Sequence, residues 1–350
     1  MENRKNTRMI KIGDKFIGGK SKITVQSMTN TDTKDIAATV KQINELYMAG
    51  CEIIRASLYD IECARCIPEI KNAIKIPIVG DIHFDHRIAI ESIKNGIDKV
   101  RLNPGNIGSD SKVKEVAEVA SEYGVSIRVG ANSGSLDKNF SHLPKAQALV
   151  ESAMKEVGIL EKAGFENIVI AIKSSDPLET IDANRMISKI CDYPLHLGVT
   201  EAGPEEYSLI KSSFAIGTLL SEGIGDTIRY SISGNPLNEV SAGHILLRSL
   251  NIEKGAKLIS CPTCSRTCIN IEEYSKKVGE FIKNIDKDIT VAIMGCVVNG
   301  IGEGKSADIG IAGTQFGGTI FRKGEILGSF RESELMDELE KIISEMTAGA

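Results

Sequence analysis

Short β-branched apolar runs alternate with amphipathic segments along most of the chain, beginning near residue 23. Eight such runs predict strands, at residues 23–28, 51–57, 76–84, 98–106, 125–135, 167–176, 195–204 and 226–234. The segments between them, such as 35–50, 111–124 and 146–164, repeat apolar residues at intervals of three and four and end at glycine, as amphipathic helices often do. Eight β-α units in succession predict an α/β fold, a closed TIM (β/α)8 barrel of parallel strands.

A doubly wound open sheet is the structural alternative to this barrel. Eight near-regular units favour closure over an open sheet. The first predicted strand is also not followed by the glycine-rich fingerprint with which open sheets bind dinucleotides. A nicotinamide cofactor therefore has little support.

The hydrophobic pattern changes near residue 255, which predicts a barrel domain at 1–254 and a smaller domain at 255–350. The second part shows a helical segment at 271–285, an apolar strand at 289–295, a glycine-rich loop at 296–313, two further strands and an amphipathic helix at 332–346. This order of elements predicts a small α+β domain.

Composition narrows the class of protein. The chain has 350 residues, 42% of them hydrophobic, and a net charge of -5, which indicates a soluble protein with a substantial core. No apolar run is long enough for a membrane span and no early run resembles a signal peptide, so we expect a cytoplasmic protein without a membrane partner. Mild acidity and few aromatic residues argue against a nucleic-acid partner. In a reducing compartment, the eight cysteines are expected to bind metal, act in catalysis or be buried.

Polar side chains interrupt the predicted strands near their carboxyl ends, which meet at one rim of a parallel barrel. They are Arg55, Asp81, His83, Arg101, Asn103, Arg128, Asn132, Lys173, Glu201, Arg229 and Ser231. Five are cations, which repel one another unless an anion is bound, and guanidinium groups suit phosphate oxygens. A single arginine at a strand end is more often part of a surface ion pair, but the set predicts a small, highly phosphorylated ligand. Asp81 and Glu201 would then bind hydroxyl groups or carry protons.

Three thiols suggest a metal centre in the second domain. Cys261 and Cys264 form a C-x-x-C pair, and Cys296 follows in "MGCVVNGIGE". This spacing is compatible with zinc, a redox disulfide or an iron-sulfur cluster, although a zinc ribbon normally shows a second cysteine pair. For a 4Fe-4S cluster the fourth ligand is either Cys268 or a non-thiol group such as Glu303. A carboxylate would leave its iron easier to open to a substrate oxygen.

Seven motifs together resemble one family of enzymes. They are "VQSMTNTDT", "DIHF", "RLNPGN", "RVGANSGS", "TEAG", "CPTC" and "MGCVVNGIGE", spread over nearly the whole chain. The family is that of the bacterial 4-hydroxy-3-methylbut-2-en-1-yl diphosphate synthases of the non-mevalonate isoprenoid pathway. Ser265 stands where this family usually has Gly, and Ile301 where it usually has Pro, which affects local loop geometry.

The resemblance implies a TIM barrel followed by an iron-sulfur domain. It implies that Cys261, Cys264, Cys296 and Glu303 bind a 4Fe-4S cluster, and that Cys268 does not. It implies that the substrate is bound by Arg55, Asp81, Arg101, Asn103, Arg128, Asn132, Lys173, Arg229 and Ser231, with Glu201 and Glu303 catalytic. We expect Glu201 to assist proton delivery to the departing hydroxyl.

The reaction implied is the reductive opening and dehydration of 2-C-methyl-D-erythritol 2,4-cyclodiphosphate. Its two electrons would come from flavodoxin or ferredoxin. The resemblance also implies a homodimer in which the tail of one subunit caps the barrel of the other. Two alternatives remain: a TIM-barrel enzyme for another phosphorylated or pterin-like ligand with a structural zinc tail, and a non-enzymatic module with a zinc-stabilised protein-binding tail. The second leaves the cationic rim unexplained.

Overall fold

A computed structural model describes residues 4–102, 107, 109–136, 138–298, 302 and 304–348. The chain forms two compact units, which divide between Leu246 and Leu247, inside helix α9 (Pro236–Ser249). The sequence pattern predicts the change of domain eight residues later, after residue 254, and both divisions leave the three thiols of interest in the second unit.

The first unit is a barrel of eight parallel strands in chain order. The strands are β3 (Thr24–Met28), β4 (Ile53–Ser57), β5 (Ile78–Asp81), β6 (Lys99–Arg101), β7 (Ser126–Val129), β8 (Ile168–Ile170), β9 (His196–Leu197) and β10 (Thr227–Ile228). β10 pairs with β3, and a parallel bridge between Ile170 and Leu195 joins β8 to β9. The ring is thereby closed, which confirms the predicted barrel and makes the open-sheet alternative wrong.

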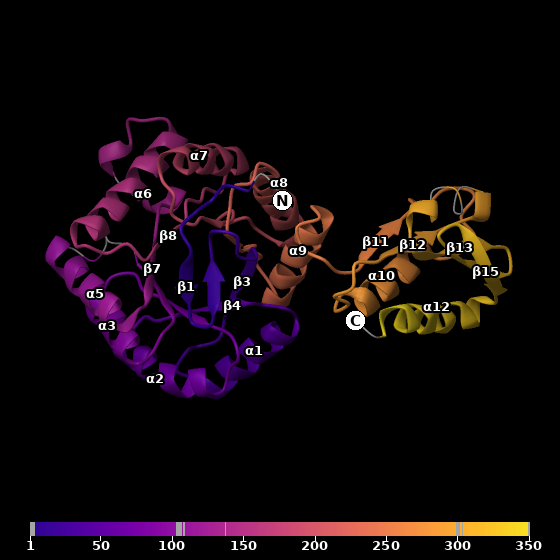
Figure 1. Ribbon diagram of the computed structural model, residues 1–350, viewed down its shortest axis with the longest axis horizontal. Coiled ribbons are helices and arrows are strands. Elements are labelled where there is room, and N and C mark those ends of the chain that lie inside the picture. Colours follow the sequence, from indigo (N-terminus) through magenta and orange to yellow (C-terminus); the bar gives the residue numbers. More distant parts are fainter. Residues whose placement is uncertain are drawn as a thin grey trace. The chain divides into compact units, whose positions relative to one another are not determined.

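Helices surround these strands (Figure 1). They are α1 (Ile36–Met48), α2 (Ile61–Asn72), α3 (His86–Lys94), α5 (Asp110–Tyr123), α6 (Lys145–Lys162), α7 (Pro177–Ile190), α8 (Glu205–Ser221) and α9. Aspartates begin several of them: Asp35, Asp60 and Asp176 each accept hydrogen bonds from backbone N–H groups of the first turn. Such caps satisfy donors that the helix itself leaves free, and so fix where each loop ends.

A β-hairpin that the hydrophobic pattern did not reveal precedes the barrel. Its strands are β1 (Ile10–Ile12) and β2 (Lys15–Ile17), which pair in antiparallel fashion. Ile12 and Ile17 are fully buried against Ile53, Val79 and Val169, residues near the amino ends of barrel strands. The hairpin therefore fills the end of the barrel opposite the rim on which the polar residues converge.

The second unit contains a five-stranded mixed sheet in the order β11-β12-β13-β14-β15. The strands are β11 (Lys257–Ser260), β12 (Thr290–Met294), β13 (Ile309–Thr314), β14 (Gly317–Arg322) and β15 (Glu325–Phe330), with helices α10 (Ile271–Ile282) and α12 (Glu332–Thr347). Both helices bury apolar residues, such as Val278 and Leu339, in one core with Ile293 and Ile311 of the sheet. The predicted α+β domain is confirmed.

Two strands of this sheet differ from the prediction. β11 was not anticipated, and β13 occupies part of the segment predicted as a glycine-rich loop. A Cβ at Gly310 would lie 2.5 Å from the ring of Phe321 and 2.6 Å from the carbonyl oxygen of Ala292. The glycine therefore makes room for an aromatic ring inside the sheet instead of forming a turn, because close packing leaves no space for a side chain.

Among the described residues, no helix is both long and apolar enough to cross a membrane.

Candidate functional site

A pocket opens at the carboxyl ends of the barrel strands. It is lined by Arg55, Asp81, His83, Arg101, Arg128, Val129, Gly130, Asn132, Ala171, Lys173, Val199, Thr200, Arg229 and Ser231. The structure thus brings together eight of the ten barrel residues predicted to bind or act on substrate. Asn103 lies outside the described residues, and Glu201 is not among the lining residues. The functional roles of these residues remain predictions.

Asp81 is shared by two arginines on the neighbouring strands. It pairs with Arg101 across β5 and β6, and its Oδ1 lies 3.5 Å from Arg101 Nη1. Its Oδ2 lies 3.9 Å from Nε of Arg55 on β4. Burial by itself would raise the pKa of Asp81, but Arg55, Arg101 and Arg128 together lower it below its usual value. The three arginines therefore favour the ionised form of Asp81, whose oxygens can only accept hydrogen bonds.

His83 lines the same part of the pocket. Its Nδ1 lies 3.0 Å from Arg101 Nη1, and its Nε2 lies 3.5 Å from Asp81 Oδ2. Burial lowers the pKa of His83, and Arg101 and Arg55 lower it further against the opposing effect of Asp81. Since arginine can only donate, Nδ1 accepts and the ring hydrogen sits on Nε2. The imidazole is thus neutral, with its N–H directed to the Asp81 side.

Two cations of the pocket are almost completely buried. Arg128 is 2% exposed and Lys173 is 8% exposed. Within the described part of the chain, Arg128 Nη1 has no hydrogen-bond partner. Burial, and then the neighbouring cations, lower the pKa values of both groups well below their usual range. An anion bound here would supply the missing counter-charge.

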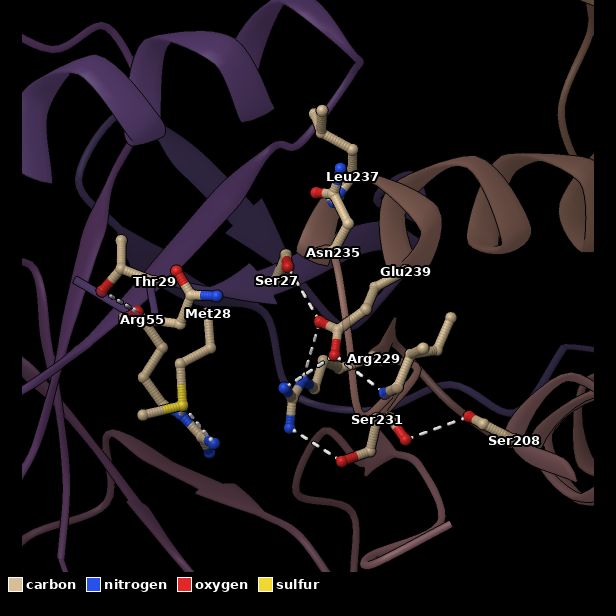
Figure 2. Close-up of polar contacts among 12 residues, drawn as sticks. Ser27, Met28, Thr29, Arg55, Ser208, Arg229, Ser231, Asn235, Leu237 and Glu239 are labelled. Atoms are coloured by element: carbon tan, nitrogen blue, oxygen red, sulfur yellow. Dashed lines mark hydrogen bonds and ion pairs between the residues drawn. The ribbon is translucent and has the colours of Figure 1, made fainter. Parts of the chain in front are cut away.

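Arg55 and Arg229 have different partners (Figure 2). Arg55 donates to the sulfur of Met28 from Nη2 at 2.8 Å and from Nε at 3.0 Å. Burial, Arg229 and Arg101 lower the pKa of Arg55 to about 10, against the opposing effect of Asp81. Arg229 instead forms a two-bond pair with the carboxylate of Glu239 on α9, at 2.9 and 3.2 Å.

Several polar groups deeper in the barrel were missed by the sequence reasoning. Lys99 and His196 are fully buried, and in the described residues neither Lys99 Nζ nor either ring nitrogen of His196 has a hydrogen-bond partner. Burial, followed by Arg128 and other cations, lowers the pKa of Lys99 well below its usual range. Barrel interiors are usually filled by branched aliphatic side chains. The strand register would have revealed Lys99, since it lies two residues before Arg101 and so faces the same side.

Two glycines allow close approach of neighbouring strands at the pocket, and one of them leaves room for Lys173. Gly130 has φ +144°, and a Cβ there would lie 2.0 Å from the carbonyl oxygen of Ala171. A Cβ at Gly198 would lie 2.6 Å from the carbonyl oxygen of Arg229 and 2.9 Å from Lys173 Nζ. Larger residues at these positions would displace Lys173 or the strands themselves.

Glu201 follows β9 at the rim, in an unusual backbone conformation. Its φ is +51°, the left-handed region that side chains with a Cβ rarely adopt. Its Oε1 lies 3.8 Å from the position a Cβ would take on Gly134, in the loop after Asn132. Its side chain is exposed. A conformation of this kind persists only where the surroundings impose it, and it is found most often at functional sites.

The second unit brings the segments of the three predicted thiol ligands to one edge of its sheet. β11 and β12 are parallel neighbours, so Cys261, directly after β11, and Cys296, just beyond β12, follow the same ends of two adjacent strands. The N–H of Gly295 donates to Cys261 Sγ at 3.1 Å. Backbone N–H of Arg266 and the hydroxyl of Thr267 lower the pKa of Cys264. Thiols stabilised in this way suit an iron-sulfur cluster, which is bound by thiolates.

Cys268 lies in the same loop. Its backbone N–H donates to the carbonyl oxygen of Gly295 at 2.8 Å, and its thiol donates to the carbonyl oxygen of Arg266 at 3.3 Å. Glu303 lies outside the described residues. Among the described residues, no three His, Cys, Asp or Glu side chains are placed close enough together to hold a metal ion. The ligand set therefore remains a prediction.

Solved structures similar to this chain share its barrel fold. Dihydropteroate synthase from Yersinia pestis superposes with a TM-score of 0.51 at 10% identity, over 69% of this chain and 98% of that one. The 7,8-dihydropteroate synthase from Vibrio fischeri superposes with a TM-score of 0.52 at 13% identity, over 70% of this chain and 98% of that one. Such low identities support the fold and give no support to a pterin-like ligand.

Relatives of known name are much more similar. Proteins named 4-hydroxy-3-methylbut-2-en-1-yl diphosphate synthase (flavodoxin) include one from Clostridium acetobutylicum, 51% identical over 97% of this chain and 99% of that protein. One from Thermotoga maritima is 48% identical over 97% of this chain and 98% of that protein.

Two family models match the two units. The GcpE TIM-barrel domain matches residues 7–244, and the GcpE protein C-terminal domain matches residues 257–345. Together they cover most of the chain, and the resemblance found in the seven motifs is confirmed. The chain belongs to the GcpE family, whose members include the 4-hydroxy-3-methylbut-2-en-1-yl diphosphate synthases.

Proposed function

We propose that this chain is an oxidoreductase of isoprenoid biosynthesis that converts 2-C-methyl-D-erythritol 2,4-cyclodiphosphate to (E)-4-hydroxy-3-methylbut-2-enyl diphosphate. The observation that carries the proposal is the barrel pocket, whose described lining residues include five cations and one carboxylate. The phosphate oxygens of a small cyclic diphosphate would supply negative charge to these cations. Its hydroxyl groups could donate hydrogen bonds to Asp81. Relatives about half identical over nearly the whole chain bear the name of this synthase.

The chain's own residues bind and orient the substrate. Asp81 accepts a substrate hydroxyl, and Asn103, which lies outside the described residues, is a further predicted substrate ligand. The diphosphate oxygens accept hydrogen bonds from Arg55, Arg101, Arg128, Asn132, Lys173, Arg229 and Ser231. Because Arg128 and Lys173 are buried, their bonds to phosphate are stronger than in water, and the set of donors together holds the ring in one orientation.

Cys261, Cys264, Cys296 and Glu303 would hold a 4Fe-4S cluster, which supplies the two electrons of the reduction when bound. The name of the relatives supports flavodoxin as the electron donor, and ferredoxin is the alternative. All eight cysteines are free thiols. Because thiols of this kind stay reduced in the cytoplasm, we place the enzyme there.

Reconstitution tests the function and the ligand set together. Anaerobic incubation with iron and sulfide should give the visible charge-transfer absorbance of a thiolate-bound cluster, and a protein that turns over the cyclic diphosphate. Cys296→Ala should lose most of the absorbance, because it removes one of three thiolates. Glu303→Ala should keep the absorbance and lose turnover.

Cys268→Ser is the matched control, since it alters a thiol of the same loop. It should assemble the cluster normally. A Cys268→Ser protein that fails to do so would establish an all-thiol site. A wild-type protein that stays colourless after reconstitution would favour a structural zinc tail, and with it the alternative barrel enzyme.

The cations of the pocket should decide substrate affinity. Arg101→Ala or Lys173→Ala should weaken binding on the order of 10- to 100-fold, because each removes charged hydrogen bonds to phosphate. The cluster absorbance should not change. Arg185→Ala is the control: Arg185 pairs with Glu222 on the barrel exterior, at 2.5 Å, and should leave affinity unaltered. Normal substrate affinity in both pocket variants would mean that these cations form structural ion pairs and do not bind the substrate.

Glu201 should act on turnover and not on binding. Glu201→Gln keeps the size of the side chain but cannot deliver a proton, so we expect normal substrate affinity and a loss of turnover on the order of 100-fold or more, the range of general acid catalysis. Binding measured by calorimetry and steady-state turnover check the two quantities separately. Unchanged turnover would remove Glu201 from the mechanism.

The assembly we propose is a homodimer in which the second unit of one chain serves the barrel of its partner. The anion pocket and the thiols belong to different compact units of the chain, which is what such an exchange requires. Covering the pocket in this way would exclude water from a reduced intermediate.

Mixed dimers test this arrangement. Arg101→Ala and Cys296→Ala should each be inactive alone, whereas a mixed dimer of the two should recover one working site. Co-expression with different tags allows the mixed species to be purified, and a dimer of two differently tagged Arg101→Ala chains is the control. If purified mixed dimers retain cluster and show no turnover, each site is built within one chain.

A further inference from the structure

Glu239 is a buried carboxylate with a complete set of partners. It lies in the first turn of α9 and is 2% exposed. Its Oε1 accepts from Arg229 Nη2 at 2.9 Å and from the N–H of Ile232 at 3.0 Å. Its Oε2 accepts from Arg229 Nε at 3.2 Å and from the hydroxyl of Ser27 at 2.8 Å. A carboxylate has about four lone-pair positions, so protein donors fill them all and Glu239 has none left for a ligand.

The same bonds determine what Arg229 offers to the pocket. Two of its N–H groups point to Glu239, and Nη1 donates to Ser231 Oγ at 3.2 Å (Figure 2). A guanidinium has five N–H donors, so the contacts among the described residues leave about two for a ligand. Arg229 and Ser231 both line the pocket, while Glu239 stands behind them and does not. The orientation of the free donors is therefore set from behind the pocket.

Arg229 is held differently from the other pocket cations. Arg55 and Arg101 share Asp81 at 3.9 and 3.5 Å, beyond good hydrogen-bond length, and Arg128 keeps an unpartnered nitrogen in the described structure. Arg229 alone among these described cations has a buried carboxylate of its own in a two-bond pair, the geometry that fixes a guanidinium plane most strongly. Glu239 thereby balances the charge of Arg229. Arg229 would contribute to anion binding through the orientation of its N–H donors more than through net charge.

We infer that Glu239 is a positioning residue of the anion site: it holds the Arg229 guanidinium and the Ser231 segment in the orientation in which both donate to the diphosphate. The bond to the N–H of Ile232, the residue after Ser231, fixes that segment, and the bond to Ser27 ties it to β3. The inference rests on the proposed function, since it concerns binding of the cyclic diphosphate.

Glu239→Gln separates position from charge, because the two predict opposite results. Removing a negative charge makes the pocket more positive, so electrostatics alone predicts tighter binding of the dianionic substrate. The NH2 group of a glutamine side chain would instead face the N–H donors of Arg229. One hydrogen bond to the guanidinium would be lost, and the guanidinium would be free to move. We expect substrate affinity to fall about 10-fold in calorimetry on the reconstituted enzyme, the effect of losing one charged hydrogen bond. Glu239→Asp keeps the charge but shortens the reach, and should also weaken binding.

Asp226→Asn is the matched control. Asp226 is 1% exposed, immediately precedes β10, and accepts from Arg4 at 2.6 Å, Thr7 at 2.9 Å and the N–H of Leu195 at 2.8 Å. It is as buried as Glu239 and accepts three hydrogen bonds, but it precedes β10, whereas Arg229, the partner of Glu239, follows β10 at the other end of that strand. Both variants should lower the melting temperature, and only the Glu239 variants should lose affinity.

A double-mutant cycle with Arg229→Ala completes the test. If Glu239 acts through Arg229, adding Glu239→Gln to Arg229→Ala should change affinity by less than about twofold. Equal losses in both backgrounds, or wild-type affinity in Glu239→Gln and Glu239→Asp, would overturn the inference while leaving the proposed function intact. A wild-type protein that does not bind the cyclic diphosphate would overturn both.

Discussion

The burial of cations without enough counter-charge is the constraint on which the rest of the barrel depends. Arg128 and Lys173 are almost fully shielded from water, and among the described residues Asp81 is the only carboxylate that lines their pocket. A buried, unpaired charge costs several kcal/mol of folding free energy. Its side chain therefore moves toward water wherever the structure allows it. The surrounding barrel must therefore be closed and rigid. Pairing of β10 with β3 provides the closure, and the buried hairpin fills the far end, so that the cations face the rim.

The barrel and much of the pocket could be predicted because both follow from periodicity. Parallel strands buried on both sides are runs of apolar residues, and in a closed barrel the residues that end those runs converge. Arg55, Asp81 and Arg101 stand on adjacent strands, so the position of each strand end was enough to bring them together. The hairpin escaped notice because strands of three residues carry too few alternations to be recognised.

Glu239 and Lys99 show the limit of this reasoning. Glu239 lies on a helix and comes close to the site only because of the tertiary fold, so the pattern of apolar strands does not indicate it. Lys99 stands at the start of a strand, where a charged residue is normally taken for a surface residue, and only the register shows that it faces inward. In the second unit, the C-x-x-C spacing indicated a metal centre, but β13 was hidden by glycines that serve packing. Local sequence patterns therefore predict helices and strands well, but they predict contacts between distant segments of the chain poorly.

Arg128 Nη1 and Lys99 Nζ have no hydrogen-bond partner in the part of the chain that the structure describes, and this has a consequence for the lifetime of the protein. A barrel that repels itself when empty is less stable than the same barrel around an anion, and any ligand that binds only the folded state stabilises it in proportion to its concentration. Substrate supply and protein abundance are then coupled without any regulator. When the precursor is plentiful, the folded population rises and fewer chains open to proteases. When it is scarce, a larger share of the chains is empty and opens more often, which exposes those chains to proteases.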